Sequence, residues 1–561
     1  MMRIAYSLLL LTCVAPLLPG LAGAVLSALG YIPAVGLQRF NLEAFISVAQ
    51  WQGVGRSLLL SVTSALLSTY LALLLCFSIV QTLWQSRHWH RVEHLLSGLL
   101  ALPHVAFAIG FAFLFAPTGI TARLASALLD YQVSTQAGTW LVQDNHALGL
   151  TLALALKETP FLLLMSIPVL QQLNVSRQLQ VGASLGYSAA QTWFKVLFPQ
   201  WLRALRFALF AVIAYAVAVV DVSLILGPNT PPTFAVLVWQ WFNDPDLQQL
   251  PRAAAGAIVL LLVTGLMLLT VVLIEKALLH CYRGWQWSGK SRFPLPGRSS
   301  LWLVSTIAAL IVPLMLVWSF AQRWRFPDLL PSQFSSRFWL SEWPTMLPTL
   351  WQSIWIALLS GSLALVAALF AHEYKLRHQA AVPLWIIVLP MLVPQLSLLL
   401  GIQISALWLA ADRYQLWVIW SHLLFAFPLV YLALDGPWRS FNPGYTRVAL
   451  SLGKSPWQQF LAVKVPLLLP AILYAWAVGI SVSLAQYLPT LMLGGGRITT
   501  ITTEAVALSS GFDRRVMAIY ALWQALLPFI FFTLAVLISR AQPHRQRIMA
   551  TAVTVSTSEK P

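Results

Sequence analysis

The chain has 561 residues, of which 59% are hydrophobic and only 9% are charged. A soluble domain carries about 25% charged residues, so most of this chain must lie in lipid. The net charge of +17 comes from Lys and Arg placed between apolar runs, which is typical of an inner-membrane protein and not of a nucleic-acid partner. The cysteines are odd in number and far apart, which argues against a disulfide framework or a zinc site; they are Cys13, Cys76 and Cys281.

Twelve apolar runs follow one another along the chain, each long enough to cross a hydrocarbon core of about 30 Å. The first six lie near 4–28, 55–83, 95–117, 147–171, 202–228 and 252–280. The second six lie near 300–322, 347–371, 382–410, 416–435, 467–493 and 517–539. The runs predict an all-α integral membrane protein of about 12 transmembrane helices, arranged as two six-helix halves.

The distribution of positive residues predicts the orientation. With the N-terminus in the cytoplasm, alternate crossings place about 20 Lys and Arg inside and about 10 outside. An even number of crossings brings the C-terminus to the cytoplasm as well, so we expect a multi-pass protein of the bacterial inner membrane. The polar, basic segment 281–299 is expected to be a cytoplasmic linker between a first half, 1–280, and a second half, 300–540, with 541–561 as a cytoplasmic tail.

An internal repeat supports the two halves. Residues 181–199 match residues 448–466 without a gap, at a constant separation of 267 positions. The identical pairs are Val181/Val448, Ser184/Ser451, Leu185/Leu452, Gly186/Gly453, Ser188/Ser455, Gln191/Gln458, Val196/Val463 and Pro199/Pro466. A second echo, at another separation, joins Pro103-His104 and Gly110 to Pro394-Gln395 and Gly401. Both long copies lie between the fourth and fifth helix of their half, which predicts parallel repeats around a pseudo-two-fold axis and a central pathway.

Each copy reads as a short helix, a glycine turn and a second helix. Gly186 and Gly453 supply the positive φ of a tight turn, and Ser188 and Ser455 are placed to cap the second helix. That helix is expected to end before Pro199 in the first copy and before Pro466 in the second. Two equivalent copies favour a stiff docking lever over an ordinary connecting loop.

These residues resemble the EAA loop of binding-protein-dependent ABC importer permeases, which reads E-A-A, three residues, Gly, nine residues, I-x-L-P. The spacing is kept by Gly186, Val196, Phe198 and Pro199, and by Gly453, Val463, Val465 and Pro466. The E-A-A itself has become Gln180-Val181-Gly182 and Arg447-Val448-Ala449, so the family's glutamate is absent from both copies. The resemblance covers roughly 55–280 and 347–540, and the fusion of two halves, each with an added first helix, is similar to the thiamine and ferric-iron permease branch.

The resemblance implies a permease subunit that forms the pathway for a small solute or ion. It implies two copies of a separate ATPase subunit docked on the loops near 180–199 and 447–466, and a periplasmic substrate-binding protein that delivers the cargo. ATP would bind the partner, and no cofactor, metal or catalytic residue is expected in this chain. Gly453-Lys454-Ser455 resembles the end of a phosphate-binding loop, but Val448 stands where its first glycine is required. The alternative is a secondary transporter, driven by an ion gradient, with two parallel six-helix halves.

Three charged residues lie well away from the ends of the predicted helices, where a charge near the bilayer centre costs upward of about 2.5 kcal/mol. They are Lys157, Glu158 and Asp221. Adjacent helical residues point about 100° apart, so Lys157 is expected to pair with Asp221 and to leave Glu158 facing the pathway. A charge network that only packs the helices is the alternative. At the same separation of 267 the second half has Leu424, Phe425 and Leu488, so the charged lining is expected from the first half alone.

Overall fold

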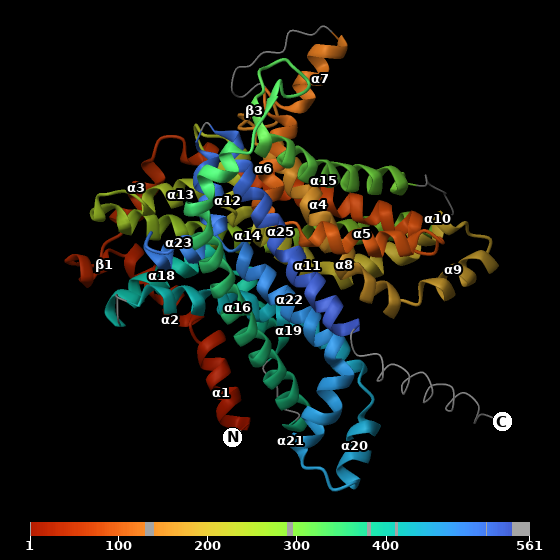
Figure 1. The fold of residues 1–561 in the computed structure, drawn as a ribbon. Coiled ribbons are helices and arrows are strands. Elements are labelled where there is room, and N and C mark those ends of the chain that lie inside the picture. The colour runs from red at the N-terminus through yellow and green to blue at the C-terminus, as the bar shows by residue number, and fades with distance from the viewer. Residues whose placement is uncertain are drawn as a thin grey trace, which may run out of the picture.

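The part of the protein that the structure describes is a bundle of helices with two short hairpins (Figure 1). A computed structural model describes residues 2–129, 140–288, 295–378, 383–409, 413–511 and 513–540. In these residues, 11 helices are long and apolar enough to cross a membrane, or up to 12 when the pair α17 and α18, bent by 92°, is one span. The all-α membrane fold predicted from the apolar runs is confirmed.

The chain order is simple to follow. The first part contains α1 Met2–Cys13, α2 Leu17–Ala28, α3 Glu43–Gln50, α4 Val54–Leu83, α5 Trp89–Ala101, α6 His104–Phe115, α7 Ile120–Leu129, α8 Leu148–Gln172, α9 Val175–Ser184, α10 Ala189–Thr192, α11 Phe198–Ala218, α12 Asp221–Leu226, α13 Phe234–Phe242 and α14 Leu250–Trp287. The second part contains α15 Gly297–Phe320, α16 Arg337–His378, α17 Leu384–Leu392, α18 Gln395–Leu409, α19 Tyr414–Ser440, α20 Pro443–Ser451, α21 Pro456–Gln459, α22 Val465–Ala485, α23 Leu488–Gly494, α24 Ile501–Ser509 and α25 Arg514–Arg540. The hairpins pair β1 Tyr31–Ile32 with β2 Leu37–Gln38, and β3 Ala321–Arg323 with β4 Gln333–Phe334, both antiparallel.

Five of the twelve apolar runs are broken into two helices. Proline explains three of the breaks, because it lacks the N–H that the next helical turn needs; Pro16 lies between α1 and α2, Pro103 between α5 and α6, and Pro394 between α17 and α18. The other two breaks separate α11 from α12 and α22 from α23, where Val219 and Gln486 have extended backbone.

The boundary between the halves differs from the prediction. Helix α14 continues through Trp287, well into the segment expected to be a linker, and α15 begins at Gly297. The linker is therefore shorter than 281–299. The predicted tail, 541–561, lies outside the described residues.

The first helices of the two parts of the chain, before and after the segment 289–294, each pack against the other part. Helix α2 lies on α18 so closely that a Cβ at Gly23 would stand 2.7 Å from the carbonyl oxygen of Gly401. Helix α15 lies on α6, where a Cβ at Gly110 would stand 2.2 Å from a side-chain carbon of Ile311. Small residues permit this close approach of helices in lipid. The first and second parts of the chain are therefore interlocked.

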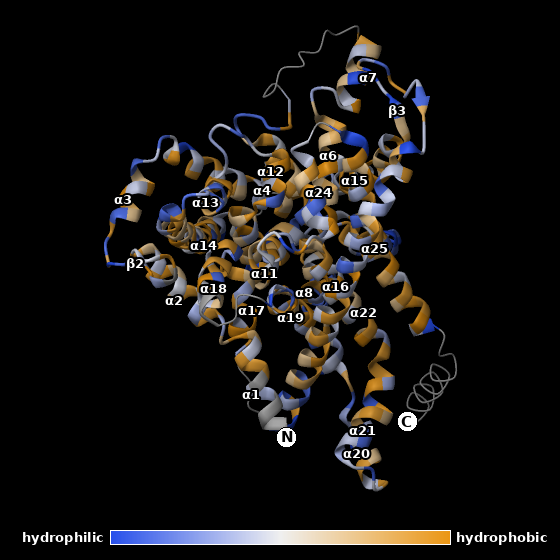
Figure 2. Cartoon of the chain, turned by 60° about the vertical axis from the view of Figure 1, so that its left-hand side comes forward, coloured by the Kyte–Doolittle hydropathy of each residue, from blue (hydrophilic) through white to orange (hydrophobic). Residues whose placement is uncertain are grey.

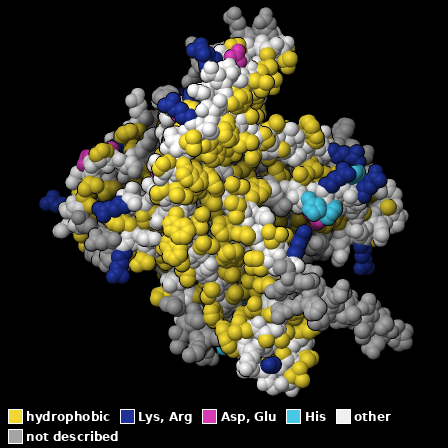
Figure 3. Space-filling model, viewed as in Figure 1, with side chains coloured by type: hydrophobic (Ala, Val, Ile, Leu, Met, Phe, Trp, Pro, Cys, Tyr) yellow, Lys and Arg dark blue, Asp and Glu magenta, His cyan; other side chains and the backbone are white. Residues whose placement is uncertain are grey.

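The outer face of the bundle is apolar. Along α14, four leucine side chains on one face of the helix are more than half exposed; they are Leu262, Leu266, Leu269 and Leu273. Hydrophobic colours run along the long helices (Figure 2), and in the view of Figure 3 hydrophobic side chains cover the middle of the molecule while Lys and Arg lie toward its margins. This surface suits contact with lipid.

Candidate functional site

The two repeated segments form loops of the same construction, which we call loop 1 (residues 180–199) and loop 2 (residues 447–466). Gly186 has φ of 81° and Gly453 has φ of 78°. In loop 1 the N–H of Tyr187 donates to the carbonyl of Gly182 at 2.9 Å, and in loop 2 the N–H of Lys454 donates to the carbonyl of Ala449 at 3.1 Å. This is the Schellman motif, in which a left-handed glycine ends a helix. The predicted glycine turns are confirmed.

The second helix of each loop begins with a capping box. Ser188 accepts from the N–H of Gln191 at 3.2 Å, and the Gln191 side chain accepts from the N–H of Ser188 at 2.7 Å. Ser455 and Gln458 make the same pair of bonds at 3.2 and 3.0 Å. Both predicted caps are therefore present, and each removes two unpaired N–H groups from the helix start.

The predicted ends of these second helices are wrong. Neither helix stops before its proline, since a π-helical turn joins α10 to α11 and another joins α21 to α22; the turns are Trp193–Leu197 and Phe460–Lys464. Pro199 and Pro466 lie in the first turn of the helix that follows, and their missing N–H leaves a carbonyl of the π turn without its helical donor. Each loop therefore continues directly into a transmembrane helix.

Matched apolar side chains stand exposed on both loops. Val181 and Val448 are 53% and 59% exposed, and Leu185 and Leu452 are 70% and 76% exposed. In Figure 1 the loops project from the body, α9 and α10 at the right and α20 and α21 at the bottom. Exposed apolar side chains in equivalent places mark a surface suited to a protein partner.

A cavity of about 370 Å³ lies between the two parts of the chain. Its polar wall comes from the first part and includes His104, Lys157, Glu158, Tyr215 and Asp221. The opposite wall comes from the second part and includes Pro390, Met391, Phe425, Leu429, Gln486 and Leu488. The three charged residues singled out from the sequence are thus brought to one cavity.

No family model matches the chain. It is, however, similar to the inner membrane ABC transporter permease protein YnjC of Escherichia coli (strain K12), with 33% identity over 517 residues that cover 91% of this chain and 94% of that protein. The chain belongs to the ABC transporter permease family. It is the permease subunit of an ABC transporter, a multi-pass protein of the inner membrane, and it works in the membrane with ATPase partners. The alternative of a gradient-driven transporter is therefore not retained.

Within the permease, the expected pair of Lys157 with Asp221 does not form. The Nζ atom of Lys157 donates to the carbonyl oxygen of Leu99 at 2.8 Å, at the end of α5. Because α5 stops before Pro103, its last carbonyls lack helical partners and favour a cation. Asp221 instead accepts from the N–H of Val222 at 2.9 Å, since the break before α12 places its carboxylate at a helix start.

Glu158 has a partner that the sequence analysis missed. Its Oε1 atom lies 2.9 Å from Nε2 of His104, the first residue of α6. His104 belongs to the weaker sequence echo, and its counterpart Gln395 also lines the cavity. This weaker repeat was the sequence feature that could have predicted His104 as a residue lining the cavity.

A second missed group is His422, buried in α19 of the permease. Its ring nitrogens lie 2.8 Å from Oγ of Ser483 and 2.9 Å from Oγ1 of Thr490. The side-chain amide of Gln486 donates to the carbonyl of His422 at 3.2 Å, and Gln486 lines the cavity. Among the described residues that line the cavity, the charged ones thus come from the first part, as expected, while the second part supplies neutral polar groups. A histidine in the middle of a predicted membrane helix was the signal for this network.

Proposed function

We propose that this permease belongs to an importer, with its two halves arranged as parallel repeats around the cavity. Loops 1 and 2 would face the cytoplasm together with both termini, and each would dock one ATPase subunit that binds ATP. A periplasmic substrate-binding protein would deliver a small solute or ion to the outer face. In its two fused halves and its loops, this permease resembles the EAA-loop permeases of the thiamine and ferric-iron branch.

The matched construction of the two loops is the observation that carries this proposal. Both have the left-handed glycine, the capping box, the π turn and two exposed apolar side chains. An apolar surface of this kind needs no glutamate at the start of the loop to bind a groove, so the loss of the family's glutamate leaves docking intact. Because each loop continues directly into a membrane helix, a subunit docked on the loop would be mechanically connected to the bundle.

The cavity is proposed as part of the translocation pathway. Its position between the halves is where alternating access requires an opening. Glu158 and Asp221 are proposed to contact the cargo, because they line this cavity and neither is paired with Lys157. A volume of about 370 Å³ suits a small solute or ion.

Co-purification tests the docking. The permease is expressed with its candidate ATPase subunit, as wild type and with Leu185→Glu and Leu452→Glu together. We expect wild type to retain the ATPase and the double variant to lose it, because a carboxylate replaces the apolar contact in both loops. Leu330→Glu is the matched control, since Leu330 is 74% exposed but lies between β3 and β4, away from both loops. Retention of the ATPase by the loop variant would contradict the proposal.

A second experiment tests the direction of transport and finds the cargo. The binding protein that stimulates ATP hydrolysis by the reconstituted complex is identified first. It is then screened for ligands that raise its melting temperature, which depends on ligand concentration relative to Kd. Stimulation by no periplasmic protein would contradict an importer.

A further inference from the structure

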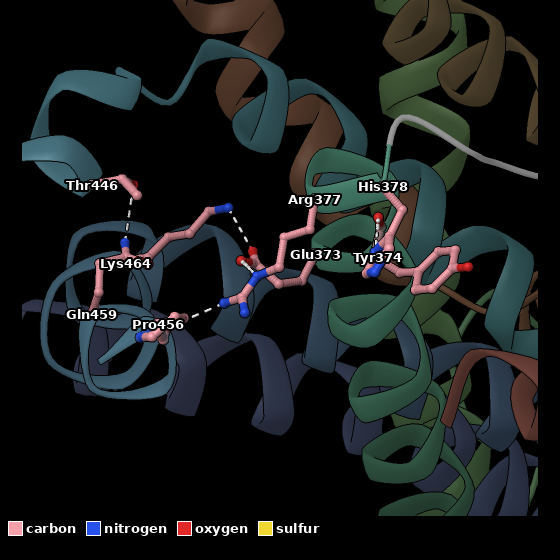
Figure 4. A network of polar contacts seen from close by, with 8 residues as sticks. All are labelled: Glu373, Tyr374, Arg377, His378, Thr446, Pro456, Gln459 and Lys464. Carbon is pink, nitrogen blue, oxygen red and sulfur yellow. Dashed lines mark hydrogen bonds and ion pairs between the residues drawn. The ribbon is translucent and has the colours of Figure 1, made fainter. Parts of the chain in front are cut away.

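Loop 2 is fixed to the end of α16 by an ion-pair network (Figure 4). The carboxylate of Glu373 accepts from Lys464 at 2.7 Å and from Arg377 at 2.9 Å. Arg377 also donates to the carbonyl of Pro456 at 3.2 Å. Pro456 begins α21, and Lys464 ends the π turn. Helix α16 therefore holds the 456–464 segment at both of its ends.

Burial makes this attachment hard to break. The side chain of Lys464 is 4% exposed and that of Glu373 is 11% exposed. The Lys464 ammonium also lies 4.4 Å from the ring centre of Trp438, near the end of α19. Separating such a pair leaves a buried charge without its partner, which is strongly unfavourable. Movement of loop 2 should therefore carry α16 with it.

Loop 1 cannot use the same attachment. Helices α4 and α16 correspond at a separation of 292 positions, because Ser61 accepts from the N–H of Phe234 at 2.7 Å and Ser353 accepts from the N–H of Ile501 at 2.8 Å. Gln81 then stands at the position of Glu373, and Leu197 at that of Lys464. Neither can form an ion pair.

The polar attachments of loop 1 come instead from α14. The hydroxyl of Tyr282 donates to the carbonyl of Phe194 at 2.7 Å, and the amide of Gln286 donates to the carbonyl of Lys195 at 2.5 Å. The Lys195 ammonium lies 5.0 Å from the ring centre of Trp285. All three contacts join the π turn of loop 1 to the last turns of α14.

Helix α16 also reaches the cavity. The hydroxyl of Ser360 donates to Ser483 at 2.8 Å, and Ser483 contacts His422, whose carbonyl accepts from the cavity residue Gln486. In the first half, Ser68 corresponds to Ser360 at the separation of 292 positions. Ala216 corresponds to Ser483, and Ala155 to His422, at the separation of 267 positions. Alanine side chains cannot continue a hydrogen-bond chain, so the described residues of the first half lack this connection.

We propose that the two loops drive different helices: loop 2 moves as one body with α16, through Glu373 and Arg377, and loop 1 moves with α14. Glu373 is a positioning residue, because it touches the loop and not the cavity. ATP-driven motion of loop 2 then reaches the second-half wall of the cavity along α16. This inference rests on the proposed docking of ATPase subunits on both loops.

Distance measurement between spin labels tests it. The permease and its ATPase are placed in nanodiscs in a Cys281→Ser background, with labels at Lys454→Cys in loop 2 and Leu363→Cys on α16, both exposed. The distance is measured without nucleotide and after trapping with ATP and vanadate. We expect no change in wild type. In Glu373→Gln the distance should shift between the two states by about 2 Å or more, the scale of helix movements at interfaces.

Three controls separate this effect from misfolding and from loss of docking. The charge swap Glu373→Lys with Lys464→Glu should restore the fixed distance, and Lys375→Ala should leave it unchanged, since Lys375 lies on the same turns of α16 but contacts Asp435 at 3.9 Å. A label pair at Ser184→Cys and Leu273→Cys should shift in Tyr282→Phe and not in Glu373→Gln.

A wild-type loop 2 distance that changes on trapping, or a Glu373→Gln distance that stays fixed, would overturn the inference while leaving docking intact. Failure of wild type to retain an ATPase would overturn both. Retained ATP hydrolysis in every labelled variant shows that the complex is assembled.

Discussion

Adjacent charges in one helix can take unrelated partners when the neighbouring helices end at different depths. Lys157 finds a carbonyl at the end of α5, and Glu158 finds His104 at the start of α6. The break at Pro103 creates both partners, because it leaves free carbonyls on one side and a new helix start on the other. Asp221 forms no ion pair with the described residues, and its carboxylate accepts from the N–H of Val222 in its own helix.

Removal of one cavity carboxylate should therefore impair transport without loss of assembly. In Asp221→Asn or Glu158→Gln we expect uptake of the cargo to fall about tenfold, since a hydrogen bond to a charged group contributes about 1.5–3 kcal/mol. Uptake into proteoliposomes, with ATPase retention measured in parallel, checks this. Asp244→Asn is the control, because Asp244 is an acid outside the cavity lining. Normal uptake in both cavity variants would mean that the charges only pack the helices.

At the scale of elements, loops 1 and 2 have the same backbone conformation but are attached to different helices. Their turns agree to within a few degrees at the central glycine, with φ of 81° and 78°. Their attachments differ, as hydrogen bonds join loop 1 to α14 and ion pairs join loop 2 to α16. The loop shape is local and repeats with the sequence, whereas each attachment depends on a distant helix that has changed.

The glycine turns give a sharp test of the loops. No atom lies within 4 Å of a Cβ built at Gly186 or Gly453, so a new side chain meets only backbone strain there. The double variant Gly186→Val with Gly453→Val should uncouple uptake from ATP hydrolysis, because a strained residue at positive φ costs about 1–3 kcal/mol. The ratio of cargo moved to ATP hydrolysed is the measurement. Asparagine, which tolerates this conformation better, is the matched substitution and should retain more coupling; full uptake in the valine variant would refute the lever.

At the scale of the molecule, the first and second parts of the chain are interlocked and unequal. Helix α2 packs on α18 at Gly401, and α15 packs on α6 at Gly110. Each part of the chain therefore contributes one helix to the packing of the other. The cavity between them has a charged wall from the first part and an uncharged wall from the second. A fused chain permits this inequality, because a homodimer would repeat every charge on both sides.

The native cysteines provide a test of the proposed orientation. Cys281 is exposed near the end of α14, whereas Cys13 and Cys76 are buried. A thiol reagent that cannot cross membranes should therefore label the permease in inverted vesicles and not in intact spheroplasts. Cys281→Ser should abolish the labelling. Labelling of Cys281 from the periplasmic side would reverse the predicted orientation.

The sequence by itself determined what depends on local chemistry and composition. Long apolar runs predicted the membrane helices, and a gapless repeat predicted two equal turns with their caps at Ser188 and Ser455. Only the tertiary structure decided where charges went and which helices hold the loops. A partner such as His104 or Glu373 comes from a helix end whose position is set by packing and by breaks elsewhere in the chain. Periodicity and spacing carry no record of those distances, which is why the pair Lys157–Asp221 was predicted wrongly while the turns were predicted correctly.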